Sequence, residues 1–121
     1  MDDFPTEEWV RRLDDAVRAA GVHGQPLVIV HELTGGAEPF RYLIRVGPDG
    51  STVTVGDAAD ATVRFRQTVA TAREIRSGEL APSEAVLLGR VGVGGDARVL
   101  VAHRETLAAL DRAMSSVTTG T

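Results

Sequence analysis

Hydrophobic side chains recur at helical spacing in the first segment of the chain, residues 6–20. The opposite face of this segment is charged, so the pattern predicts an amphipathic helix. Thr6 is suited to cap its start, because a threonine hydroxyl accepts a bond from the backbone of the first turn, and Gly21 and Gly24 end it. The predicted apolar face consists of Trp9, Val10, Leu13, Ala16, Val17 and Ala20.

Four strand-like runs follow this helix. At the start of residues 27–33 the positions on both faces of the strand are apolar, which is typical of a central strand. Apolar and polar positions alternate in residues 40–46, 51–55 and 61–66. A proline-aspartate-glycine turn at residues 48–50 separates the second run from the third. The alternation indicates a sheet with one buried face and one wet face, and all helices must then pack on the same side.

Arginines occupy the predicted wet face of the sheet. Arg41 and Arg45 share it on one strand, and Arg64 and Arg66 share it on another. They could form a small positive patch. The sequence favours instead a solvated face on which these arginines form ion pairs with nearby acidic side chains.

Two short helices are predicted after the fourth strand. Thr68 is suited to cap a helix over residues 69–77, and Gly78 stops it. Pro82 stands in the first turn of a second helix that runs to Leu87. Proline is tolerated there because the first turn of a helix needs no backbone N–H from it.

The last part of the chain predicts a strand and a helix. Residues 89–93 form a fifth strand with its two valines facing inward, and Asp96 caps a last helix over residues 97–114. The tail, residues 115–121, is expected to be disordered. The 121 residues thus predict one α+β domain with the order helix, four strands, two helices, strand and helix.

Composition narrows the classes of partner. The formal net charge of −4 disfavours nucleic acid or an anionic membrane surface, although all 13 basic residues are arginine. There is no cysteine, and hence neither a disulfide nor thiol chemistry. No secretory signal or membrane-spanning run is present in the sequence, so we expect a cytoplasmic protein without stable membrane insertion. The oligomeric state stays open.

A glycine-rich segment, residues 92–97, formally fits the dinucleotide fingerprint G-x-G-x-x-A. We reject this interpretation because no strand with a ribose-binding acid follows. Asp96 would also place negative charge where a pyrophosphate should lie. A tight corner between strand and helix is enough to explain the glycines, and no cofactor is expected.

The titratable residues do not predict a catalytic or metal site. His23, His31 and His103 lack metal-ligand spacing, and no pair of carboxylates suited to acid–base chemistry can be assembled. His31 is expected on a sheet face and His23 in a loop. His103 falls on the apolar stripe of the last helix, where it is more simply a hydrogen-bonded or rim histidine than a ligand contact.

Four short motifs resemble the sterol carrier protein 2 (SCP-2) family over nearly the whole chain. They are Asp60-Ala-Thr-Val63, Ser77-Gly-Glu-Leu80-Ala-Pro82, Ala85 to Gly89, and Gly94-Gly-Asp96 at the start of the last helix. The opening F-P-T-E-E-W-V is similar to that of small stand-alone bacterial members. The chain departs from the family where Arg90 replaces a frequent lysine and where glycines fill the fifth strand.

The resemblance implies a mixed, mostly antiparallel five-stranded sheet with helices on one face. It also implies a hydrophobic tunnel between sheet and helices that takes sterols, fatty acids or fatty acyl-CoA. Much of the helical apolar surface is alanine and valine, and small side chains opposite a sheet can leave a cavity. The leading hypothesis is therefore a non-catalytic carrier of a lipid-like ligand.

Apolar side chains of the second half are the predicted ligand contacts, with a histidine as polar anchor. They are Leu80, Val86, Leu88, Val99, Leu100, His103, Leu107, Leu110 and Met114. Two alternatives remain open at this stage. One is an enzyme or enzyme subunit that acts on an apolar biosynthetic intermediate in the same pocket, and the other is an interaction module with a filled core.

Overall fold

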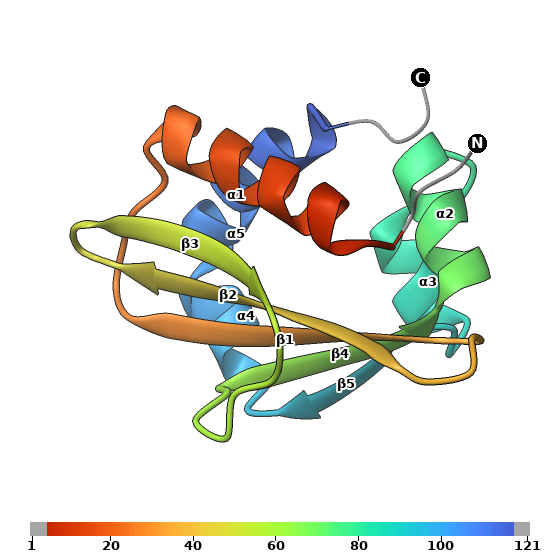
Figure 1. Cartoon of the computed structure of the whole chain (residues 1–121). Helices are drawn as coiled ribbons and strands as arrows, with labels where there is room; N and C mark the ends of the chain where they lie inside the picture. The colour runs from red at the N-terminus through yellow and green to blue at the C-terminus, as the bar shows by residue number, and fades with distance from the viewer. Residues whose placement is uncertain (1–4, 118–121) are drawn as a thin grey trace.

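A five-stranded sheet carries the helices on one of its faces (Figure 1). The computed structural model describes residues 5–117, apart from the side chains of residues 82 and 83. Within that range the elements are, in chain order, α1 (Glu7–Ala20), β1 (Leu27–Thr34), β2 (Phe40–Gly47), β3 (Gly50–Val55), β4 (Val63–Thr68), α2 (Val69–Ser77), α3 (Pro82–Leu87), β5 (Gly92–Gly95), α4 (Arg98–Ala102) and α5 (Arg104–Ser115).

The strand order is β3-β2-β1-β4-β5. β1 lies at the centre, where it pairs antiparallel with β2 and parallel with β4. The remaining pairs, β2 with β3 and β4 with β5, are antiparallel. The predicted mixed, mostly antiparallel sheet is therefore confirmed, and β1 is the central strand that its apolar sequence indicated.

The main core lies between the sheet and the helices. Leu27, Ile29 and Leu33 of β1 pack with Trp9 and Leu13 of α1 in this layer. The alternate side chains of β1 point to the outer face of the sheet, where Val30 packs with Leu43 and Ala58 in a small second cluster. The loop between β3 and β4 supplies Ala58. This second cluster explains why β1 is apolar on both faces.

The outer face of the sheet is paired as predicted. Arg41 and Arg66 both contact Glu32, at 2.9 and 2.7 Å. Arg45 contacts Asp60 at 3.1 Å and Arg64 contacts Asp57 at 2.7 Å. All four arginines therefore meet carboxylates, so they form an ion-paired surface and not a positive patch.

The helix ends follow the sequence signals. The Thr6 hydroxyl accepts from the Trp9 N–H at 3.1 Å, and the Thr68 hydroxyl accepts from the Thr71 N–H at 3.0 Å. Gly21 and Gly78 end their helices in the left-handed region, with φ of 66° and 84°. A residue with a Cβ is strained there.

The fifth strand lies later in the chain than predicted. It covers Gly92–Gly95 and not residues 89–93. The chain after α3 stays coiled, because the Arg90 N–H donates to the Ala85 carbonyl at 2.8 Å. Val91 is buried just before the strand, and Val93 stands opposite Phe65 on the helix-facing side, where the sheet edge leaves it 37% exposed. The predicted inward direction of both valines is therefore confirmed.

The last helix is divided where the sequence predicted one continuous element. His103 separates α4 from α5, with φ −108° and ψ 21°, outside the helical region. The N-cap of α4 is Ala97, which makes no side-chain cap bond, so the predicted cap at Asp96 lies one residue too early. The Asp96 carboxylate still accepts from the N–H of Arg98, the first residue of α4, at 3.1 Å.

The structured chain also continues beyond the predicted start of the tail. Ser115 belongs to α5, and Val117 packs against the core. The Arg76 guanidinium donates to the Val117 carbonyl at 2.9 Å, which ties the end of this segment to α2. Residues 118–121 of the predicted disordered tail lie outside the described residues.

Candidate functional site

A cavity of about 270 Å³ lies between the sheet and the helices α1, α2 and α5. Three strands form its floor, and the end of α5 with the residues after it closes one side. Its lining is mainly apolar, with a few polar groups. The lining residues are Trp9, Leu13, His31, Leu33, Tyr42, Gln67, Ala72, Ile75, Arg76, Asp111, Met114, Ser115 and Val117.

His31 lies on the floor of the cavity between two aromatic rings. Its ring stacks on Tyr42, with 4.8 Å between centroids, and on Phe65, with 5.2 Å. Burial lowers the pKa of His31 from 6.5 to about 4, since a charged imidazolium would lose its hydration there. Burial also raises the pKa of Tyr42. Both side chains are therefore neutral at pH 7.

Two polar atoms of the floor are buried without a protein partner. They are Nδ1 of His31 and Oε1 of Gln67, and neither has a hydrogen bond to any of residues 5–117. Buried polar atoms are satisfied in the large majority of cases. Both atoms are enclosed by protein and have no surface open to the cavity, so they are two unsatisfied polar groups beneath its floor.

The rim of the cavity holds the charged groups. The Arg76 guanidinium lies over the Trp9 ring, 5.4 Å from its centroid, and donates to the Val117 carbonyl. Asp111 and Ser115 are exposed on α5. Charge is thus concentrated at the rim, and the floor is neutral.

Met114 is the predicted contact that lines this cavity. Leu110 is buried in the main core, and Val99 and Leu107 pack against that core partly buried. Leu80 is buried in a smaller cluster with Ala85 and Val91.

The other predicted contacts lie toward solvent. Val86 and Leu88 are 46% and 66% exposed, because α3 turns Ala85 inward and these side chains outward. Leu100 is partly buried. His103 lines a surface cleft beside His23 and Gly24 and not the cavity, which removes it from the position of a polar anchor there. The assignment of the nine residues as ligand contacts stays a prediction.

The polar floor was not predicted from the sequence, although one signal for it was available. His31 lies on the same face of β1 as Leu27, Ile29 and Leu33, and this face is buried. A histidine at an inward position of a central strand is a buried polar group that needs a partner. Gln67 follows Val63 and Phe65 on the inward parity of β4 in the same way.

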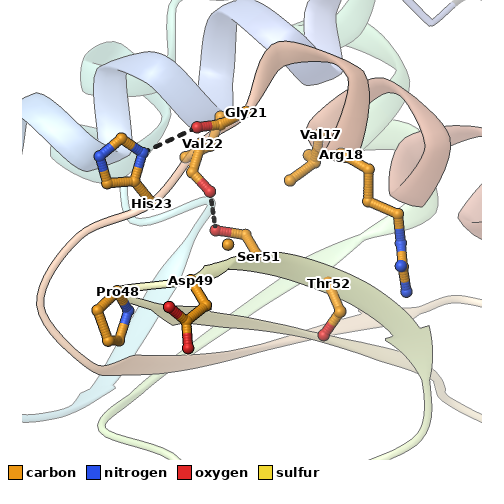
Figure 2. A pocket seen from close by; sticks show the side chains of 10 residues that line it. Val17, Arg18, Gly21, Val22, His23, Pro48, Asp49, Ser51 and Thr52 are labelled. Carbon is orange, nitrogen blue, oxygen red and sulfur yellow. Dashed lines mark hydrogen bonds between the residues drawn. The ribbon is translucent and has the colours of Figure 1, made fainter.

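A larger surface cleft of about 620 Å³ lies between the end of α1 and the turn from β2 to β3 (Figure 2). Two of its polar side chains already bond within the protein. The Ser51 hydroxyl donates to the Val22 carbonyl at 2.8 Å, and His23 Nδ1 lies 2.9 Å from the Gly21 carbonyl (Figure 2). These bonds fasten the loop after α1, so the cleft is explained by the fold.

Two other kinds of site do not occur in the described chain. Residues 5–117 contain no group of three His, Cys, Asp or Glu side chains that could hold a metal ion. No helix in that range is long and apolar enough to cross a membrane.

Comparisons with solved structures identify the fold. A crystal structure of sterol carrier protein 2 matches with a TM-score of 0.68 and 18% identity, over 96% of this chain and 100% of that one. A conserved hypothetical protein from Thermus thermophilus, described as possibly a sterol carrier protein, matches with a TM-score of 0.68 and 18% identity, over 99% of this chain and 93% of that one. Palmitated SCP2L2 from Aedes aegypti matches with a TM-score of 0.66 and 16% identity, over 90% of this chain and 95% of that one.

The same fold also forms part of an enzyme. The sec-alkylsulfatase Pisa1 from Pseudomonas sp. matches with a TM-score of 0.60 and 15% identity, over 95% of this chain and 16% of that one. No model of a known protein family matches the sequence. No curated protein sequence matches it. The likeness therefore establishes the fold of the chain.

Proposed function

We propose that this chain, which has the fold of sterol carrier protein 2, binds an apolar small molecule between its sheet and helices and carries it unchanged. The observation that supports this most is the cavity itself, which α1, α2, α5 and three strands line with mainly apolar side chains. A chain with a filled core would present no such space. The structural neighbour that holds palmitate is consistent with an apolar occupant.

The volume limits the size of this molecule. A cavity of about 150 Å³ accepts benzene, so one of about 270 Å³ has room for on the order of ten non-hydrogen atoms. Burial of each methylene contributes about 0.8 kcal/mol. Ten of them contribute about 8 kcal/mol, which corresponds to a micromolar dissociation constant before the costs of association.

The chemistry of the lining supports carriage without reaction. A general base needs a proton donor or orienting group within hydrogen-bond reach, whereas His31 stacks face to face on Tyr42 and has no hydrogen-bond partner at Nδ1 among residues 5–117. The carboxylate of the lining, Asp111, is exposed on α5. These features support the proposed role as a binding protein and not as an enzyme.

A matched pair of variants tests the site. Ala72 of α2 is buried and lines the cavity, and Ala70 of the same helix is exposed. Ala72→Phe is expected to fill part of the cavity and to weaken binding of 1-nonanol, measured by calorimetry, by at least about tenfold. Ala70→Phe makes the same substitution on the solvent side and should leave the affinity unchanged.

Native mass spectrometry of the purified wild-type protein supplies a second measurement, since a carrier can retain its ligand. Equal affinities of both variants for 1-nonanol would contradict binding in this cavity. Consumption of a bound compound, with a product in the mass spectrum, would contradict the non-catalytic role.

A further inference from the structure

We infer that the end of α3 docks reversibly onto a neutral lipid bilayer and inserts its apolar side chains among the acyl chains. Three successive residues carry this inference, Val86, Leu87 and Leu88, which are 46%, 86% and 66% exposed. Their side chains are the α3 tip. A contiguous exposed apolar surface marks an interaction site, whereas apolar residues scattered singly do not.

The α3 tip is convex. Successive residues of a helix point about 100° apart, and Ala85, the residue before the tip, is fully buried. The three side chains that follow it therefore fan out over about 200° on the side away from the core. Gly89 then turns the chain, with φ of +73°. A flat protein surface would contact one side of such a fan, whereas fluid acyl chains surround all of it.

The size of the α3 tip also favours a bilayer over a protein partner. Three aliphatic side chains present on the order of 300 Å², whereas a specific protein interface buries about 800 Å² on each partner. A second copy of this chain that docked through the tip alone would fall short of that area. Insertion into a bilayer has no such threshold, because each methylene that enters hydrocarbon contributes separately.

The charges beside the α3 tip select a neutral bilayer. Glu79 and Glu84 are exposed, and the Arg90 guanidinium is paired with the Glu74 carboxylate. Residues 79–90 contain no other charged side chain. The net charge beside the tip is therefore negative, so it repels an anionic headgroup and attracts the ammonium group of phosphatidylcholine.

α3 joins this tip to the wall of the cavity. Ala85 packs with Leu80 and Val91 in a buried cluster, and Ile75 of α2 both packs against this cluster and lines the cavity. α2 and α3 lie side by side (Figure 1). Docking thus brings the cavity wall to the phase in which an apolar ligand dissolves. That consequence rests on the proposed function, whereas docking itself requires no ligand.

Flotation with phosphatidylcholine vesicles tests the docking. The double variant Leu87→Ser, Leu88→Ser is expected to lower the partition coefficient of the protein at least about tenfold, since two leucine side chains no longer enter hydrocarbon. Val101→Ser is the control, because Val101 is 67% exposed on α4, away from α3 (Figure 1). It should bind as the wild type does. Vesicles of phosphatidylglycerol should bind the wild type more weakly than those of phosphatidylcholine.

A fluorescent variant reports insertion even if the serine variant does not fold. The emission of Leu87→Trp is expected to shift to shorter wavelength when phosphatidylcholine vesicles are added. Lipids with brominated acyl chains should quench it. Val101→Trp should show neither effect.

The outcomes separate this docking from ligand binding in the cavity. Absence of vesicle binding, equal binding of the double serine variant, or stronger binding to phosphatidylglycerol would overturn the docking. Dimers of the wild type that the serine variant does not form would assign the α3 tip to a second copy and also overturn it. Vesicle binding without binding of 1-nonanol would support the docking and reject the proposed function.

Discussion

A single imidazole sets the character of the cavity floor. His31 lies stacked between Tyr42 and Phe65. Burial lowers its pKa from the ordinary 6.5 to about 4. The folded protein therefore resists protonation of a group that the unfolded chain protonates readily, and this difference links stability to pH.

The His31→Phe variant measures this linkage. Between pH 6.5 and 4 the unfolded chain takes up a proton at His31 that the folded protein does not, so stability is complete above pH 6.5 and falls as the pH falls. The wild type should lose about 2 kcal/mol more than His31→Phe between pH 7 and pH 5, measured by urea unfolding. Phenylalanine keeps the stack and does not titrate.

The control for that measurement is His23→Phe, the same substitution at an exposed loop position. It should follow the pH dependence of the wild type. A hydrogen bond from Arg41 lowers the pKa of Glu32, and hydrogen bonds from the Ala58 N–H and from Arg64 lower the pKa of Asp57. These carboxylates lose their contribution to stability at still lower pH in all three proteins. Parallel curves for the wild type and His31→Phe would show that His31 is accessible to protons in the folded state.

At the scale of elements, the fifth strand depends on one glycine. Gly95 ends β5 with φ of +86°, and a Cβ there would lie 2.4 Å from the Thr62 carbonyl oxygen. Gly94, one residue earlier, has room, because its nearest atom would be the Arg64 Cβ at 3.9 Å. The close approach of Gly95 lets the Asp96 N–H donate to Thr62, which fixes the corner before α4.

Gly95→Ala is expected to destabilise the protein by more than about 2 kcal/mol, since both the backbone conformation and the contact with Thr62 are lost. Gly94→Ala should be neutral or stabilising by up to about 1 kcal/mol, because a side chain reduces the entropy of the unfolded strand. Urea unfolding of both variants gives the comparison. A similar loss of stability in Gly95→Ala and Gly94→Ala would show that the corner at Gly95 tolerates a Cβ.

Whole-molecule architecture sets the volume available to the ligand. The sheet gives a rigid floor of paired strands, and α1, α2 and α5 form the wall around the cavity. Arg76 links two parts of this wall by donating to the Val117 carbonyl. The cavity holds on the order of ten non-hydrogen atoms and is open on one side, so a longer ligand must either extend through that opening or displace the wall.

A series of 1-alkanols measures that limit. Affinity should rise about fourfold per added methylene up to about ten non-hydrogen atoms, and then level off. The affinity of Ala72→Phe should level off at a shorter alkanol, and the affinity of Ala70→Phe should level off at the same chain length as that of the wild type. A steady gain beyond that length in the wild type would contradict this size limit and would show that the ligand gains further apolar contacts outside the space or that the space expands on binding.

Local signals determined most of the fold. Thr6, Thr68, Gly21 and Gly78 set their helix ends through bonds within one turn, and alternation set the two faces of β2 and β4. These features depend on neighbours in the sequence, so the sequence could predict them. The position of β5 depends on its pairing with β4, a distant segment, and on the coiled turn after α3. The periodicity of the sequence predicted neither this position nor the break at His103.

The sequence by itself determined an α+β domain with helices on one face of a sheet, because side-chain periodicity decides which face is buried. The lining of the cavity was decided by the tertiary structure. Met114 lines it, whereas Leu80 and Leu88, equally apolar, do not. Apolar character predicts burial without saying against what. Only strand register and helix placement brought His31 and Gln67 onto the floor of one cavity, because residues far apart in the sequence share a lining only in the folded chain.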